Sequence, residues 1–143
     1  LDTAAFFGVF RFGVLAPDDK RLRKASESLS DWLCCKTPFG GAARYEGDAY
    51  YRADARLPGN PWVISTLWYA QYLIAIAEKT RELEEALVWL NWTVDRVSGA
   101  GMLPEQVDPH TGAPVSASPL VWSHAEYVYT VLQYLAKLKE LEK

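Results

Sequence analysis

The chain has 143 residues, of which 50% are hydrophobic and 13% aromatic, and this is enough to bury the core of one domain. Its net charge is −3 at pH 7 and its basic residues are scattered, which argues against a nucleic-acid-binding surface. Its apolar runs are all shorter than the roughly 18 residues of a membrane-spanning helix, so we expect neither nucleic acid nor a membrane among its partners.

Two helices are predicted within the first 35 residues. Asp2 or Thr3 can cap a first helix that continues to about Leu15 and is apolar on almost every side, which is typical of a buried helix. The segment 17–19 ends this helix and begins a second one over about residues 20–35. The second helix has a polar side and an apolar side, which predicts a surface helix whose core-facing residues are Leu22, Ala25, Leu29, Trp32 and Leu33.

A long connection rich in Gly, Pro, Arg and Asp follows over residues 36–60. After it, a third helix is predicted over about residues 62–79. Pro61 stands at its first turn, where a missing N–H costs nothing. The third helix is again apolar on most sides, so we expect it to be buried.

The fourth predicted helix begins at Thr80 and ends near Ser98, with Gly99 as the residue that terminates it. Its apolar stripe predicts a surface helix that faces the core through Leu83, Ala86, Leu87, Leu90, Val94 and Val97. Ser123 and Glu126 have the spacing of a capping box for a fifth helix that runs to Lys143. The fifth helix is predicted to face the core through Val128, Val131, Leu132, Leu135 and Leu138.

The five helices therefore alternate between buried and exposed along the chain. Short connectors join each buried helix to the exposed helix after it, and long connectors join each exposed helix to the next buried one. If consecutive helices are antiparallel, both long connectors lie at one end of the molecule. This predicts an all-α domain over residues 1–143, made of antiparallel hairpins arranged as an arc of inner and outer helices, with its working face on one rim.

The second long connection, within residues 99–126, carries the strongest candidate for chemistry. Ordered connections of this length in a compact domain are commonly functional. Glu105 stands in it between Pro104 and Gln106, and helix amino termini at this end would favour carboxylates. Taken alone, a loop glutamate is more often a solvated surface residue, so the flanking sequence has to decide its role.

Neither cofactor nor metal is predicted. The two histidines, His110 and His124, do not make a metal site, and His124 is expected to be structural. Cys34 and Cys35 are neighbours, which argues against a disulfide and favours a thiol pair in a cytoplasmic protein. The chain opens on Leu1 and has no methionine before position 102, so we expect a piece of a longer protein.

Several linked motifs resemble glycoside hydrolase family 15, which comprises glucoamylases with related glucodextranases and trehalases. The matching segments span nearly the whole chain in order: Asp18-Asp19-Lys20-Arg21; Arg44-Tyr45-Glu46-Gly47-Asp48; Gly59-Asn60-Pro61-Trp62; Thr66-Leu67-Trp68; Leu103-Pro104-Glu105-Gln106; and Pro119-Leu120-Val121-Trp122-Ser123-His124-Ala125-Glu126. This resemblance implies part of an (α/α)6 toroid of six helical hairpins. It also implies hydrolysis of α-glucosidic bonds with inversion, and an oligosaccharide or glucose-type ligand.

The resemblance also assigns roles to residues of this chain. It implies that Glu105 is the general base and that Arg44 and Asp48 bind the sugar. Tryptophans would line the same subsite, namely Trp62 and Trp122. Two further residues, Ser123 and Tyr45, would support the site without contacting the substrate, and Ser123 would lie close to the base.

Simpler roles for these residues stay open. Arg44 and Asp48 have the spacing of an ion pair that staples a loop, and Trp62 has the position of a core residue at a helix start. Ser123 has the position of a plain helix cap. For Arg44 and Asp48 the ion pair is compatible with a contribution to the subsite, whereas for Trp62 and Ser123 the simpler role is an alternative to it.

One part of the family pattern is absent. The general acid of the family comes from a Trp-Glu segment, and none of the six tryptophans here is followed by an acid. We therefore expect the carboxy-terminal part of a catalytic domain, inactive alone and completed by a second chain or by self-association. The alternative is a non-catalytic helical scaffold or a module that binds carbohydrate or protein.

Overall fold

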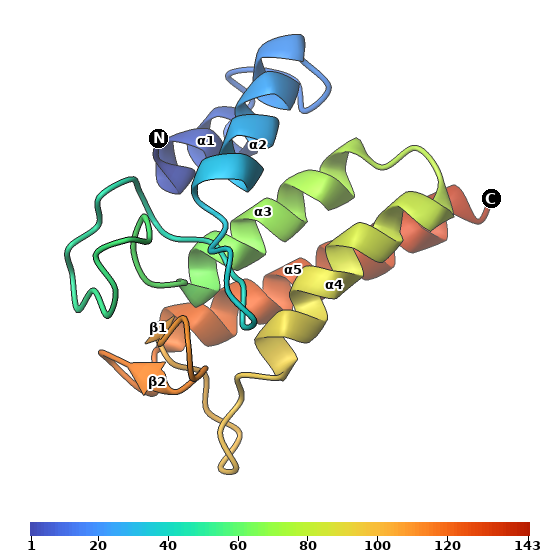
Figure 1. Cartoon of the computed structure of the whole chain (residues 1–143). Helices are drawn as coiled ribbons and strands as arrows, with labels where there is room; N and C mark the ends of the chain where they lie inside the picture. The colour runs from blue at the N-terminus through green and yellow to red at the C-terminus, as the bar shows by residue number, and fades with distance from the viewer.

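The computed structural model describes residues 1–143, and it consists mainly of helices (Figure 1). The helices are α1 (Thr3–Arg11), α2 (Lys20–Trp32), α3 (Val63–Ile76), the short 3₁₀ turn η1 (Thr80–Glu82), α4 (Leu83–Val94) and α5 (Val121–Leu141). Two short strands, β1 (Gln106–Val107) and β2 (Pro114–Val115), pair antiparallel. The predicted all-α class and the five main helices are confirmed, whereas the strand pair was not predicted.

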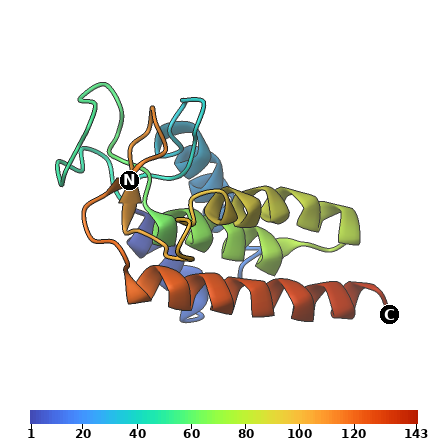
Figure 2. The same cartoon turned by 90° about the horizontal axis from the view of Figure 1, so that it is seen from below.

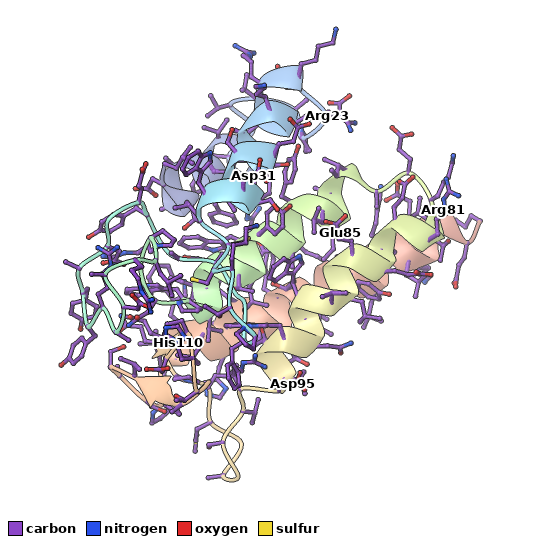
Figure 3. All side chains as sticks on the ribbon, viewed as in Figure 1. Arg23, Asp31, Arg81, Glu85, Asp95 and His110 are labelled. Atoms are coloured by element: carbon purple, nitrogen blue, oxygen red, sulfur yellow. The ribbon has the colours of Figure 1, made fainter.

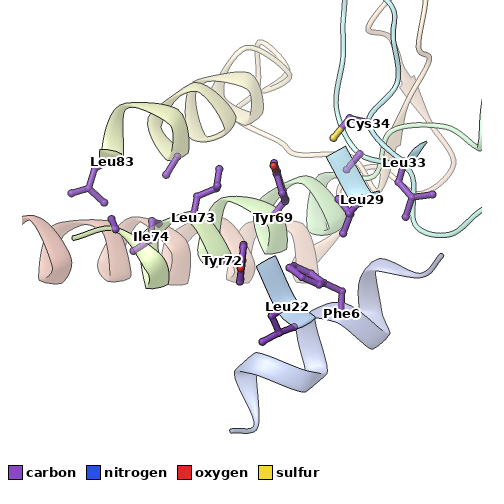
Figure 4. Packing of buried hydrophobic residues seen from close by; sticks show 13 residues of the cluster. Phe6, Leu22, Leu29, Leu33, Cys34, Tyr69, Tyr72, Leu73, Ile74 and Leu83 are labelled. Carbon is purple, nitrogen blue, oxygen red and sulfur yellow. The ribbon is translucent and has the colours of Figure 1, made fainter. Parts of the chain in front are cut away.

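Helix α3 is the centre of the fold. Its first twelve residues, from Val63 to Ile74, are all buried, and it packs against α1, α4 and α5. The main core cluster joins α3 to α1, α2 and α4 through residues such as Phe6, Leu29, Tyr72 and Leu83 (Figure 4). Burial of these large apolar side chains is the principal stabilising contribution to the fold.

Consecutive helices α3, α4 and α5 run antiparallel, and α5 lies along one side of the molecule (Figures 1 and 2). The short connectors join α1 to α2 and α3 to η1, as predicted. Both long connections lie at the end where α3 and α5 begin (Figure 2). The expectation of two long loops on one rim is therefore confirmed.

The first four helices are shorter than predicted, whereas α5 begins two residues before Ser123 and ends at Leu141. Helix α1 stops at Arg11 because Gly13 adopts a φ of 69°, a left-handed conformation that terminates helices. Helix α2 stops at Trp32 because Cys34 leaves the helix to form a bridge with Ala42.

Helices α3 and α4 also end early. Helix α3 stops at Ile76 because Ala77 is extended, and the carboxylate of Glu82 accepts hydrogen bonds from the next two backbone N–H groups. Helix α4 stops at Val94, well before Gly99. There the last turn tightens, and the guanidinium of Arg96 donates to the backbone carbonyl oxygen of Phe39. Gly99 is therefore not the residue that ends this helix.

The predicted capping box at the start of α5 is wrong. The helix begins at Val121, and the hydroxyl of Ser123 donates to the carbonyl oxygen of Pro104 at 2.7 Å. A hydroxyl committed to another loop cannot cap its own helix, and the N-terminal residue Leu120 makes no side-chain cap.

Several residues predicted to face the core are exposed. The exposed residues are Val128, Leu132 and Leu135 on α5, Leu87 and Val94 on α4, Val97 just after α4, and Trp32 on α2. The first helix was predicted to be buried, yet only Thr3 and Phe6 of α1 are. The physical reason is that only α3 is surrounded by other helices, so α1 and α5 have a partner on one side only.

Two further expectations can be compared with the structure. Both cysteines are buried free thiols, and burial raises the pKa of Cys34 to about 11 and that of Cys35 to about 12. None of the helices combines the length and hydrophobicity that crossing a bilayer requires.

Candidate active site

The two long connections meet at the amino-terminal end of α3. Ala43 of the first connection bridges Pro61, and Gln106 of the second bridges Trp62. The backbone N–H of Val63, the first residue of α3, donates to the carbonyl oxygen of Glu105 at 3.1 Å. The segment around Trp62 is therefore held between the two loops that carry the candidate residues.

The backbone around Glu105 is fixed on both sides. Its N–H donates to the carbonyl oxygen of Ala117 at 2.8 Å, and its own carbonyl accepts from α3. The hydroxyl of Ser123 donates to the carbonyl oxygen of the preceding residue, Pro104. The ring nitrogen Nε2 of His124 accepts from the N–H of Leu103 at 3.0 Å, so His124 has the structural role expected of it.

Unlike the backbone of Glu105, its carboxylate makes no hydrogen bond within the protein. The side chain is half-buried, and its Oε2 atom is buried without a hydrogen-bond partner in the protein. Buried carboxylate oxygens nearly always have a partner, and an exception calls for an explanation. A carboxylate with a free oxygen on a fixed backbone has the properties of a proton acceptor.

A second cluster is centred on Asp48, which is only 1% exposed. Its Oδ2 atom accepts from the indole Nε1 of Trp62 at 3.0 Å and lies 3.5 Å from the Nε atom of Arg44. Its Oδ1 atom accepts from the backbone N–H of Tyr50 at 3.1 Å. The ion-pair interpretation of Arg44 and Asp48 therefore describes a real contact, and the indole of Trp62 joins it.

The guanidinium of Arg44 lies between two aromatic rings. Its Cζ atom is 4.4 Å from the ring centre of Trp62 and 4.8 Å from that of Tyr45, distances typical of cation–π contacts. Trp62 itself is only 3% exposed, so most of its surface is used in these contacts. The first connection thus holds one planar cation in a defined place.

Two cross-links between the loops were not foreseen from the sequence. The buried amide of Asn60 donates from Nδ2 to the Oε1 atom of Gln106 at 2.9 Å. Near the loop tips, Nε2 of His110 lies 2.9 Å from Oδ2 of Asp54. A hydrogen bond from the guanidinium of Arg56 holds the pKa of Asp54 well below its usual range, so this carboxylate is ionised when it meets His110. Asn60 and Gln106 both belong to motifs that resemble family 15, and this was the only feature of the sequence that pointed to them.

Trp122 lies at the start of α5 and is 50% exposed. Its indole Nε1 donates to Oε1 of Glu126 at 3.2 Å, and its ring meets that of Trp68 edge-on at 5.8 Å. The structure thus brings Arg44, Tyr45, Asp48 and Trp62 together around one carboxylate, and Ser123 holds the backbone beside Glu105.

A family model for glycosyl hydrolases family 15 matches residues 23–132, which include all of these residues. The chain belongs to glycoside hydrolase family 15. The family 15 domain is 30% identical over 142 residues to an uncharacterised glycosyl hydrolase of Methanocaldococcus jannaschii, covering 93% of this chain and 22% of that protein. It is 31% identical over 134 residues to a glucoamylase of Clostridium sp., covering 87% of this chain and 18% of that enzyme.

Solved structures of similar proteins agree with this assignment. A bacterial glucoamylase complexed with acarbose superposes with a TM-score of 0.80 at 27% identity, over 96% of this chain and 20% of that one. A glycosidase variant in complex with glucose gives a TM-score of 0.75 at 25% identity, over 94% and 36%. The family 15 chain therefore spans about a fifth of the length of the curated relatives that it matches. The resemblance stated from the sequence, and the assignment to part of an (α/α)6 toroid, are confirmed.

Proposed function

We propose that this chain forms the general-base portion of an inverting α-glucosidase of glucoamylase type. The observation that carries the proposal is the free, buried Oε2 atom of Glu105, held on the same rim as Arg44 and Asp48. Membership of a glycoside hydrolase family and similarity to a bacterial glucoamylase structure support the reaction class.

In the proposed reaction Glu105 acts on water rather than on the sugar. Its carboxylate accepts a proton from a water molecule as the water oxygen bonds to the anomeric carbon. A carboxylic acid on the opposite side protonates the departing glycosidic oxygen, so the configuration inverts. The two carboxyl groups of such a pair stand roughly 6.5–9.5 Å apart, which leaves room for the water.

The proposed glucose subsite uses the cluster around Asp48. The guanidinium of Arg44 offers a planar set of donors to sugar hydroxyls, while the buried carboxylate of Asp48 holds this guanidinium in the subsite. Trp62 fixes both groups through its indole N–H and its ring face, and Trp122 offers an exposed ring to the apolar side of a sugar. Tyr45 and Ser123 support Arg44 and the Glu105 loop.

The isolated chain should bind maltose without hydrolysing it. The chain carries part of the proposed subsite, whereas none of its tryptophans precedes an acid, the arrangement in which the family supplies its general acid. We expect maltose to shift the indole N–H signal of Trp62 in an NMR titration, and no glucose to appear in an enzymatic glucose assay.

The matched variants for this titration are Arg44→Ala, which removes the subsite cation, and Arg81→Ala, which removes an exposed arginine of η1. Only Arg44→Ala should abolish the shift. Glucose release by the purified chain would refute the proposal that this chain supplies the general base but not the general acid. A silent Trp62 signal would favour the scaffold alternative.

We also propose that the exposed apolar side of α5 is covered by a second chain or a second copy. Val121, Val128, Leu132 and Leu135 are each more than half exposed, and contiguous apolar surface of this kind marks interaction sites. We expect association at high concentration in sedimentation velocity experiments. Leu132→Asp should return the chain to a monomer.

The control for this experiment is Val88→Asp, because Val88 is 61% exposed but belongs to α4 and not to α5. It should leave association unchanged. A monomer at every concentration tested, with both variants behaving like the parent chain, would count against this interface.

A further inference from the structure

Trp32, at the carboxy-terminal end of α2, is 66% exposed. The apolar pattern of α2 places it with Leu29 and Leu33, yet these two are buried and Trp32 is not. A single exposed tryptophan carries no conclusion alone, because surface apolar residues are common. The surroundings of this one make it different.

Two surface hollows meet at Trp32. The larger, of about 470 Å³, lies between the end of α2 and the first long connection, and Asp31, Lys36, Arg52 and Arg56 line it. The smaller, of about 280 Å³, is lined by Ser28 and Leu1. Both hollows share Trp32 and Glu46, so the indole stands between two spaces that are each bordered by hydrogen-bonding groups.

The cations around the larger hollow are already engaged. Lys36 donates from Nζ to the carbonyl oxygen of Ser30 at 2.9 Å, and Arg56 forms an ion pair with Asp54. Arg52 donates to the backbone carbonyl oxygens of its own loop, at Asp54, Ala55 and Leu57. These cations stabilise the walls and have little left to offer an anionic ligand.

The free groups are of a different kind. The carboxylate of Asp31 has no hydrogen bond or ion pair within the chain, and the indole N–H of Trp32 has no acceptor. Glu46 lies 3.3 Å from the amino group of Leu1 and is otherwise exposed. Because the cations of the larger hollow are engaged by the protein and the carboxylate of Asp31 is free, the site favours an uncharged ligand with hydroxyl donors over an anionic ligand.

An exposed aromatic face with carboxylate acceptors beside it is suited to a sugar. The ring covers the apolar face of a pyranose, and carboxylate oxygens accept hydrogen bonds from its hydroxyl groups. We propose that Trp32, Asp31 and Glu46 form a second binding site for a neutral saccharide chain, outside the subsite around Asp48. That the saccharide is an α-linked glucan rests on the proposed function.

The position of this second site suits a saccharide that is longer than the proposed subsite can hold. Glu46 and Gly47 stand in the loop between Arg44 and Asp48, so one turn of backbone borders the second site and carries the proposed subsite. Asp31 projects from the last turn of α2, well apart from His110 of the second connection (Figure 3). A glucan too long for the subsite therefore has a second place to bind on the α2 side of the same loop.

The test is an NMR titration of the chain with maltoheptaose. The indole N–H signal of Trp32 and the amide signals of Asp31 and Glu46 should shift together. Trp32→Ala should weaken this binding by at least about tenfold, as expected for the loss of an exposed tryptophan that anchors a ligand. Because the side chain is largely exposed, the variant should keep its helical circular dichroism.

The matched control is Phe12→Ala, which removes an aromatic side chain that is 80% exposed at the end of α1. Equal binding by Trp32→Ala and Phe12→Ala, or an unmoved Trp32 signal at saturating maltoheptaose, would overturn the second site. An equal response of Trp32 to a β-linked glucan of similar length would overturn the α-glucan assignment.

The experiment can overturn the second site and the proposed function independently of each other. In Arg44→Ala, the Trp32 response should persist while the Trp62 response is lost. A Trp62 response without a Trp32 response would overturn the second site and leave the catalytic proposal standing.

Discussion

Replacing Glu105 with glutamine should lower the turnover of an α-linked glucan by about 10²–10⁴-fold, the range typical of a general base. The experiment uses the chain assembled with the general-acid portion of the enzyme, because this chain is proposed to supply only one of the two carboxyl groups. Glutamine has the shape of glutamate but cannot accept the proton of the attacking water. Glucose-type ligands should still bind, because Arg44 and Asp48 are untouched.

The readouts are the rate of glucose release and the affinity for glucose, measured on the same preparation. Glu84→Gln is the control, because Glu84 is exposed on α4, far from the loops that meet at Trp62. Unchanged turnover in Glu105→Gln, with glucose binding intact, would remove Glu105 from the reaction. The chain would then be better described as a helical scaffold that binds sugar.

The sequence predicted the arrangement of helices well because hydrophobic pattern is a local signal. Helix α3 is apolar on most sides, and the structure surrounds it with other helices. Prolines and glycines marked the long connections, and the alternation of short and long connectors placed both loops at one end. These features follow from burial and from backbone preference, which single residues carry.

The helix ends depended on partners far away in the sequence. Ser123 has the spacing of a cap, but its hydroxyl bonds to Pro104 in a loop nineteen residues earlier. Arg96 closes the end of α4 by reaching Phe39. A local pattern cannot reveal that a side chain will be used by a distant segment, so such predictions fail where loops meet.

The motifs identified the candidate residues, but they did not predict the contacts that these residues make. Glu105, Arg44 and Asp48 could be named from the sequence alone. The unpaired oxygen of Glu105, the contact of Arg44 with Trp62 and the link between Asn60 and Gln106 all need three-dimensional positions. The exposure of Trp32 also depends on where α2 ends, and the hydrophobic pattern did not specify that.

Gly41→Ala should reduce the free energy of unfolding by about 2–5 kcal/mol. Two costs contribute: Gly41 has a φ of 87°, which costs an L-residue about 1–2 kcal/mol, and overpacking a filled site adds about 1–3 kcal/mol. A Cβ atom at this position would lie 2.7 Å from the Cβ atom of Pro61 and would overlap the ring of Trp92. Urea denaturation followed by circular dichroism measures the change.

Gly47→Ala is the matched control, because it separates the two costs. Gly47 has a similar φ of 79°, but an added Cβ atom would meet nothing within 4 Å. It should lose only the backbone contribution, about 1–2 kcal/mol. Gly41 adjoins the Ala43–Pro61 bridge that seats the first connection against α3, so its variant should also weaken maltose binding at the Asp48 cluster. Equal destabilisation by the two variants would mean that the ring of Trp92 moves aside without cost, and that the amino-terminal end of α3 is less tightly packed than the contacts of Gly41 indicate.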